Sequence, residues 1–213
     1  CGKTTVARIL AKALNCLSPE SGEPCCGCRS CQAIAGGESL DVVEIDGASN
    51  NSVDEVRQLK SQVPLVPFAS KYKIYIIDEV HMLSTSAFNA LLKILEEPPE
   101  HVVFIMATTN PEKIPATILS RTQIYRFGLA DLETMCHFLA QVADQEQIKI
   151  SPEALQIIAK RGGGSFRDSL SILDQLSTIS APGQTIEATD VSTALGIPEY
   201  QEIQDLLSAF ESS

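Results

Sequence analysis

The sequence has no apolar run near the roughly 18 residues that a membrane-spanning helix requires. It also has no basic stretch followed by an apolar segment, the pattern of a secretory signal peptide. The chain does not begin with Met, so an upstream targeting signal would lie outside the printed residues. Internal repeats and low-complexity segments are absent as well. We therefore expect a globular protein without a membrane partner.

Basic residues are scarce. Lys and Arg number 16 against 27 Asp and Glu, which gives a net charge of −11. A protein that grips DNA alone needs clustered cations to displace counterions from the phosphates. If nucleic acid is a partner, a local patch or an assembly must hold it.

The first part of the chain has the pattern of a doubly wound α/β domain. Continuous apolar runs, typical of parallel strands buried on both faces, occur at 42–45, 72–78, 102–107 and 124–127. Helical patterns lie between the first three runs, at 53–63 and 86–97, and another helix starts directly after Lys3-Thr4. Alternating strands and helices predict a parallel sheet with helices on both faces.

The rest of the chain has no strand pattern. Ser151-Pro152 is a helix N-cap followed by Pro at the first helical position. We predict a domain at 1–128 with an excursion at 16–37, then a small helical domain at 129–196. The helices of this domain are predicted from Leu132 onward and at 151–161, 166–179 and 189–195. A further, incomplete helix is predicted after it, at 197–213.

Gly2-Lys3-Thr4-Thr5 matches the second half of a phosphate-binding loop, G-x-x-x-x-G-K-[ST]. In such a loop the Lys neutralises phosphate charge, the Thr hydroxyl binds Mg²⁺, and the following helix directs its positive end at the phosphates. A match this short also fits chance or a plain helix start, so it needs a partner elsewhere in the chain.

Asp78 and Glu79 supply that partner, because they end an apolar strand. A carboxylate there can hold Mg²⁺, and the next one can orient an attacking water. An acidic strand end entering solvent is the alternative for this pair alone, but together with Lys3-Thr4 it favours a nucleoside triphosphatase. His81 is either a polar contact or switch near the site or an ordinary helix-entry residue.

Four of the seven cysteines fall within seven residues, at 25, 26, 28 and 31. Cys16, Cys25, Cys28 and Cys31 contain two overlapping C-x-x-C units, the ligand set of a closed structural zinc site. Two disulfides are the alternative, but a cytoplasmic protein that uses ATP lies in a reducing compartment. We expect zinc to stabilise the excursion rather than to catalyse.

Three other polar features fall at useful places. Thr108, Thr109 and Asn110 follow the strand at 102–107, and open α/β sheets bind ligands at such strand ends. Arg121 precedes the run at 124–127, and Arg167 lies in the first turn of a predicted helix. Each arginine taken alone is better explained by a surface salt bridge.

Together these segments resemble the bacterial DNA polymerase III gamma/tau family, AAA+ ATPases of the sliding-clamp loader. The resemblance rests on the cysteine knuckle and on GKTTVARILAKALNC, EIDGASNNSVDEVR, IYIIDEVHMLSTSAFNALLKILEEPP, ATTNPEKIPATILSR and GGSFRDSLS. It covers nearly the whole chain. One departure is Thr122, which gives SRT where the family usually has SRC, but Arg121 is intact.

The resemblance implies a P-loop AAA+ domain with a zinc-binding insertion, an all-α lid and the start of a C-terminal oligomerisation (collar) domain. It implies that Glu79 activates water and that Arg121 acts in trans on the ATP site of an adjacent subunit. It assigns Mg²⁺ to Thr4 and Asp78, and zinc to the four cysteines. The nucleotide-binding positions that it implies are Gly2, Lys3, Thr4, Thr5, Asp78, Thr109 and Arg167.

The family's partners would be gamma/tau copies, delta and delta-prime in a pentameric ring, the sliding clamp, and primer–template DNA. The DNA-directed DNA polymerase (nucleotidyltransferase) label would apply only through the holoenzyme, because no polymerase carboxylate constellation occurs in this chain. Two alternatives remain: a non-catalytic, delta-prime-like scaffold, or another AAA+ DNA motor such as a Holliday-junction helicase.

The resemblance also places a first strand, which precedes Cys1, between the strands at 102–107 and 124–127. A sheet without that strand would have unpaired backbone groups on both sides of a gap. We therefore expect the 213-residue chain, expressed alone, to be poorly soluble and unable to hydrolyse ATP.

Overall fold

The computed structural model describes residues 2–49, 63–180 and 183–197. These form two compact units that divide after Arg126. Most of the predicted helix at 53–63 and of the predicted segment at 197–213 lies outside the described residues.

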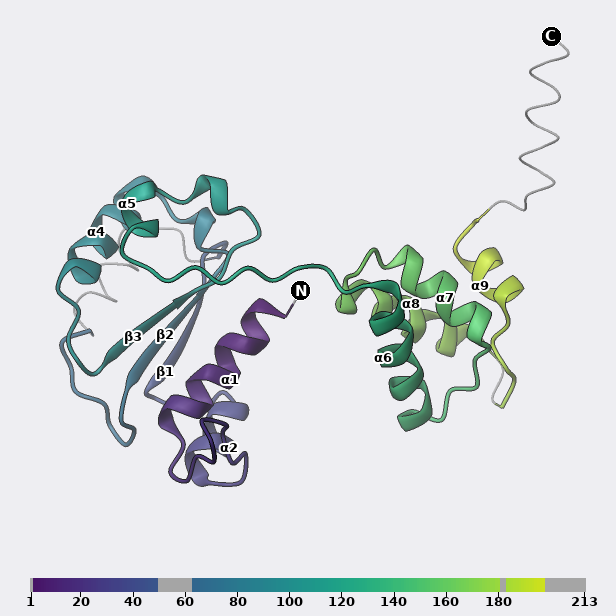
Figure 1. Cartoon of the computed structure of the whole chain (residues 1–213), viewed down its shortest axis with the longest axis horizontal. Helices are drawn as coiled ribbons and strands as arrows, with labels where there is room; N and C mark the ends of the chain where they lie inside the picture. The colour runs from purple at the N-terminus through teal and green to yellow at the C-terminus, as the bar shows by residue number, and fades with distance from the viewer. Residues whose placement is uncertain (1, 50–62, 181–182, 198–213) are drawn as a thin grey trace, which may run out of the picture. The chain divides into compact units, whose positions relative to one another are not determined.

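A three-stranded parallel sheet organises the first unit (Figure 1). Its strands are β1 (Val42–Asp46), β2 (Lys73–Asp78) and β3 (Val102–Met106), hydrogen-bonded in the order β1-β2-β3. Asp46 lies opposite Asp78 in the register of β1 and β2. β2 is buried from its first residue to its fifth, as expected for a central strand covered on both faces.

Helices cover both faces of the sheet. Successive side chains of β2 point to opposite sides, so alternate residues of this strand pack against different helices. Ile74 and Ile76 pack with residues of α1 (Lys3–Asn15) and α2 (Arg29–Ala35). Tyr75 and Ile77 pack with residues of α4 (Thr85–Glu96). Full burial of one such aliphatic side chain is worth about 1.5–3 kcal/mol. The predicted α/β fold with a parallel sheet is confirmed, and α2 is an addition that the sequence did not indicate.

The predicted strand at 124–127 is wrong. This segment has no regular secondary structure, and Ile124 and Tyr125 are 57% and 74% exposed. Among the described residues the sheet ends at β3, so no strand lies beside this segment to share backbone hydrogen bonds. An apolar run adopts the strand conformation only where a neighbour can pair with it. Between β3 and this segment the chain forms only η2 (Pro111–Lys113) and α5 (Ala116–Leu119).

A buried carboxylate fixes the loop that leads into β2. Asp41 is 3% exposed, and its two oxygens accept backbone N–H bonds from Phe68, Ala69 and Ser70 at 2.6, 2.9 and 2.9 Å. Burial alone would raise the pKa of the Asp41 carboxyl, but the hydrogen bonds outweigh it and the pKa is lowered. Asp41 therefore joins the start of β1 to the start of β2.

The second unit is helical. It contains α6 (Leu132–Gln145), α7 (Pro152–Arg161), α8 (Phe166–Ile179) and α9 (Ala188–Ala194). Ser151 caps α7 as predicted, because its hydroxyl accepts the N–H of Ala154. The core includes the fully buried Met135, Leu139, Ile158, Leu173 and Val191.

Gly164 connects the start of this unit to the turn before α8. Its φ is +78°, in the left-handed region, and its carbonyl accepts the N–H of Ala130 at 3.2 Å. A Cβ at this position would lie 2.7 Å from the Cβ of Leu129 and 2.8 Å from the Ala130 carbonyl oxygen. Both the conformation and the contact therefore require glycine.

Candidate nucleotide site and cysteine cluster

The start of α1 and the end of β2 meet at one point. Thr4 donates its hydroxyl hydrogen bond to Oδ2 of Asp78 over 2.7 Å. Gly2 precedes the helix with φ +82°, and its carbonyl accepts the N–H of Val6, the first bond of the helical ladder. Lys3 and Thr5 share this first turn, whose backbone N–H groups have no partner earlier in the helix. The half-motif and the strand-end acid predicted as its partner are thus in contact.

Glu79 turns sharply away from β2. Its backbone is left-handed, with φ 44° and ψ 44°, and its N–H donates to Oδ1 of Asp78 at 2.9 Å. A non-glycine residue in this region carries strain of about 1–3 kcal/mol. The turn leads into the short helix η1 (Val80–Met82), and the two adjacent carboxylates have different side-chain partners: Thr4 for Asp78 and Thr109 for Glu79.

Oε2 of Glu79 is held by the turn after β3. Thr109 donates both its backbone N–H, at 3.2 Å, and its hydroxyl, at 2.9 Å, to this oxygen. Nδ1 of His81 lies 3.1 Å from the same oxygen and 2.9 Å from Oγ1 of Thr108. The structure thus shows His81 as a polar contact of Glu79, one of the two interpretations of this residue.

The two candidate arginines belong to other elements of the chain. Arg121 is bound to its own chain: Nη2 pairs with Oε1 of Glu96 at 3.1 Å, and Nη1 donates to the carbonyl of Thr117 at 2.8 Å. Arg167 is the second residue of α8, in the helical unit. Action of Arg121 in trans and contact of Arg167 with nucleotide both stay predictions.

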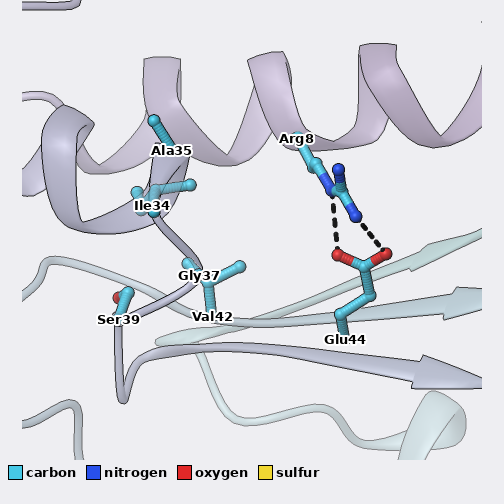
Figure 2. A pocket seen from close by; sticks show the side chains of 8 residues that line it. Arg8, Ile34, Ala35, Gly37, Ser39, Val42 and Glu44 are labelled. Atoms are coloured by element: carbon cyan, nitrogen blue, oxygen red, sulfur yellow. Dashed lines mark hydrogen bonds and ion pairs between the residues drawn. The ribbon is translucent and has the colours of Figure 1, made fainter.

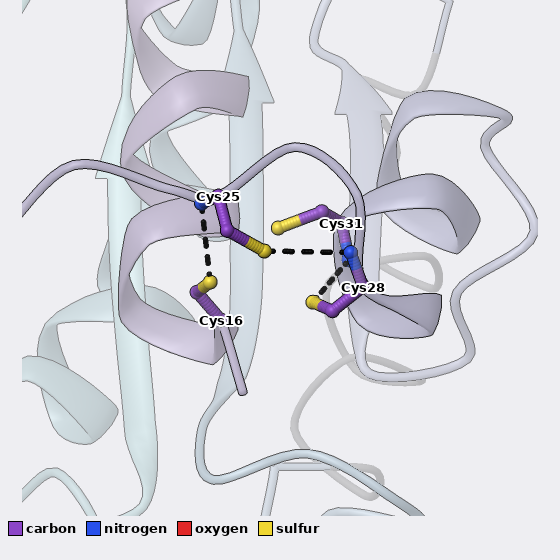
Figure 3. A group of neighbouring side chains, drawn as sticks. All are labelled: Cys16, Cys25, Cys28 and Cys31. Atoms are coloured by element: carbon purple, nitrogen blue, oxygen red, sulfur yellow. Dashed lines mark hydrogen bonds between the residues drawn. The ribbon is translucent and has the colours of Figure 1, made fainter. Parts of the chain in front are cut away.

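The four predicted metal-binding cysteines converge (Figure 3). The Sγ atoms of Cys16, Cys25, Cys28 and Cys31 all lie within 4.8 Å of one another. The backbone N–H groups of Cys25, Cys28 and Cys31 each donate to the sulfur of the preceding cysteine of this set, at 3.3, 3.4 and 3.5 Å. These bonds stabilise negative charge on sulfur and fold the knuckle around a common centre.

The cluster fits a tetrahedral thiolate site. Zn–S bonds of about 2.3 Å place sulfurs about 3.8 Å apart, so a small contraction of the cluster would suffice. Hydrogen bonds from the Ser18 hydroxyl and the Gly27 amide lower the pKa of Cys25 to about 6. Burial raises the pKa of Cys31 to about 12. A divalent cation would supply the charge that allows all four thiols to ionise.

A separate hollow of about 430 Å³ lies between α1, α2 and β1 (Figure 2). Arg8 makes a bidentate ion pair with Glu44 across it, with N···O distances of 2.9 and 2.7 Å. This pair was not predicted, because no sequence pattern links residues so far apart. The lining contains none of the strand-end residues; it comprises Arg8, Ile34, Ala35, Gly36, Gly37, Ser39, Val42 and Glu44.

Comparison with models of known protein families assigns the chain to a family. Residues 1–130 match the model described as "DNA polymerase III, delta subunit". Residues 135–181 match the "DNA polymerase III clamp loader subunit, ATPase lid domain". The tau subunit of DNA polymerase III from Bacillus subtilis is 48% identical over 195 residues, which are 92% of this chain. The chain belongs to the DNA polymerase III gamma/tau family.

Other gamma/tau subunits are similar to this chain over nearly its whole length. The Escherichia coli tau subunit is 44% identical over 208 residues, and the Mycobacterium tuberculosis (strain H37Rv) gamma/tau subunit is 44% identical over 211 residues; each match covers 98% of this chain. The matches take up 34%, 32% and 36% of the B. subtilis, E. coli and M. tuberculosis proteins. This chain thus spans about a third of the length of these gamma/tau subunits.

Solved structures show the same fold. The Thermotoga maritima RuvB Holliday junction branch migration motor has a TM-score of 0.62 and 17% identity, covering 92% of this chain and 58% of RuvB. Its P216G mutant gives a TM-score of 0.63 over 92% of this chain and 60% of the mutant chain. This likeness establishes a P-loop AAA+ fold for this gamma/tau family member. None of the described helices combines the length and the apolar composition that a membrane span requires.

Proposed function

We propose that this chain binds and hydrolyses ATP as a motor subunit of the DNA polymerase III clamp loader. One observation carries the proposal: the hydroxyl of Thr4 is bonded to Asp78, and Glu79 lies at the same strand end. A P-loop ATPase needs its phosphate loop and its strand-end acids at a single location.

Each residue has a role in the proposed reaction. Lys3 and the amides of Gly2 and Thr5 bind the phosphates. Mg²⁺, when bound with ATP, would neutralise charge on the β- and γ-phosphates, and Thr4 and Asp78 are the residues that would hold it. The fit is supported by their direct contact, since a hydroxyl and a carboxylate are the oxygen ligands that Mg²⁺ prefers.

Glu79 would orient the attacking water and accept its proton through a carboxylate oxygen. The water oxygen bonds to the γ-phosphorus while the bond to the bridging oxygen of ADP breaks. Thr109 would sense the γ-phosphate from the turn after β3, and Arg167 would reach it from the helical unit. Arg121 would leave Glu96 to complete the site of an adjacent subunit.

The cysteine cluster has a separate structural role in this proposal. Zinc held by Cys16, Cys25, Cys28 and Cys31 would stabilise the excursion between α1 and β1, because four thiolates leave no open position for water. The convergence of the four sulfurs supports this assignment.

Family membership supports the choice of partners. We propose a cytoplasmic, pentameric ring of gamma/tau, delta and delta-prime subunits that opens the sliding clamp and places it on primer–template DNA. ATP would act by favouring one ring state, which requires contacts that differ between the states. DNA contact by the ring interior is compatible with the net charge of −11. The polymerase label would come from the holoenzyme alone.

The alternative of a delta-prime-like scaffold predicts no ATP binding. The test is ATP binding and turnover by the full-length protein in its assembled complex, with the variants Lys3→Ala and Glu79→Gln. We expect Lys3→Ala to lose ATP binding, and Glu79→Gln to bind ATP but to turn over at least about 100-fold more slowly. The exposed Glu112→Gln is the matched control.

If the unaltered complex shows no ATP affinity, the scaffold assignment replaces ours. Stimulation by Holliday junctions but not by clamp and primed DNA would favour another AAA+ motor.

A further inference from the structure

His81 is placed between the two strand ends of the candidate site. It lies in η1, two residues after Glu79, and only 8% of its side chain is exposed. Its Nδ1 contacts Glu79 on the β2 side, at 3.1 Å, and Thr108 on the β3 side, at 2.9 Å. A single ring nitrogen thus connects the carboxylate to the turn that carries Thr109.

The two oxygens of the Glu79 carboxylate have different surroundings. Oε2 is approached by three polar groups: the Thr109 N–H, the Thr109 hydroxyl and Nδ1 of His81. Within the part of the chain that the structure describes, no group hydrogen-bonds to Oε1. One oxygen is therefore held in place, and the other is left to receive a proton from water.

The contacts of Nδ1 also indicate which ring nitrogen carries hydrogen. A bare nitrogen facing a carboxylate oxygen at 3.1 Å would bring two lone pairs together, whereas an N–H would be attracted to it. Oγ1 of Thr108 already accepts the N–H of Asn110 at 2.9 Å and has a second lone pair for the same donor. We therefore infer that the imidazole carries its hydrogen on Nδ1, where it is hydrogen-bonded to Oγ1 of Thr108 and the same nitrogen lies 3.1 Å from Oε2 of Glu79.

We propose that His81 is a positioning residue for ATP hydrolysis: it fixes Glu79 through Oε2 and leaves Oε1 to act on water. This inference rests on the proposed function, in which Glu79 is the base. His81 itself touches neither ATP nor water in the proposal. Bases in active sites are commonly oriented by a third group, and a small misplacement of a catalytic group can cost a large factor in rate.

The test compares His81→Ala with His81→Asn in the full-length protein within its assembled complex. Asn places an N–H at the δ position that Nδ1 of His81 occupies, while Ala removes it. We expect His81→Ala to lower kcat about 10- to 100-fold while ATP affinity stays within about twofold. We expect His81→Asn to recover at least about tenfold of that loss, because an N–H returns to the position between Thr108 and Oε2 of Glu79.

The controls separate this inference from the proposed function. His137→Ala changes an exposed histidine on α6 and should leave kcat unchanged. If Glu79→Gln turns over like the parent complex, the proposed function falls, and this inference falls with it. If Glu79→Gln is inactive but His81→Ala keeps its kcat within twofold, only the role of His81 is overturned. A loss of kcat that Asn does not restore, accompanied by weaker ATP binding or a lower melting temperature, would also overturn it and indicate a purely structural residue.

Discussion

Replacement of Asp41 should loosen the connection between the two strand starts. Its carboxylate is buried and accepts three backbone N–H bonds, from Phe68, Ala69 and Ser70. A hydrogen bond to a charged group contributes about 1.5–3 kcal/mol. Phe68 is 82% exposed, so water can replace part of what the amides lose. We therefore expect Asp41→Ala to lower the free energy of unfolding by about 3 kcal/mol, below the sum of three such bonds.

The assay combines urea unfolding of the full-length protein with hydrogen exchange of the peptide covering residues 64–72. Asp41→Ala should shift the first-unit transition to lower urea and increase exchange at the three amides. Asp41→Asn keeps one acceptor oxygen and should lose about half as much. The exposed Asp144→Asn is the matched control. An Asp41→Ala protein within about 0.5 kcal/mol of the parent, with unchanged exchange, would refute the reasoning.

The effect should also depend on pH, with a definite sign. The pKa of Asp41 is lower in the folded protein than its ordinary value. Its contribution is therefore fully present above the unfolded value of about 3.9 and is lost as pH falls through the folded pKa. The stability difference between the parent and Asp41→Asn should be constant from neutral pH down to about pH 5 and shrink below about pH 4.

Three further outcomes can be checked directly. The purified full-length protein should contain about one zinc per chain by elemental analysis, and Cys25→Ser should lose it and expose residues 16–37 to protease. Gly164→Ala should lower the stability of the helical unit by about 2 kcal/mol or more in thermal melts, because a Cβ would clash with Leu129. Gly163→Ala should lower the stability by less, because a Cβ there has no neighbour within 4 Å, although its φ is also positive, at +57°. Thr4→Val should raise the Mg²⁺ concentration needed for half-maximal ATP turnover at least severalfold, since its hydroxyl is the proposed ligand; an unchanged Mg²⁺ dependence would contradict that role.

The central sheet could be predicted because its signals are local and redundant. β2 is apolar from Ile74 to Ile77, between Lys73 and Asp78 at its ends, and burial on both faces requires such an apolar run. Ser151 could be assigned as an N-cap because the cap bond spans only three residues. The convergence of the four cysteines was likewise encoded by spacing, since C-x-x-C places two sulfurs beside one centre.

The errors and omissions arise from interactions with distant residues. The segment at 124–127 has the composition of a strand, but a strand exists only with a paired neighbour. The loop contacts of Asp41 join residues that are 27 to 29 positions apart, and no sequence period marks them. For Glu79 and Thr109, the strand-end rule predicted proximity, but it did not predict that both donors of Thr109 would bind a single oxygen.

Selection for heat resistance alone would act against Glu79. Its left-handed backbone is a conformation that glycine, and to a lesser degree asparagine, adopts at lower cost. A library screened only for survival at high temperature should therefore enrich Gly or Asn at position 79 and yield robust proteins that lack the proposed catalytic carboxylate. Engineers who need a stable and active clamp-loader subunit should keep this codon fixed and search for stability at positions remote from the strand ends.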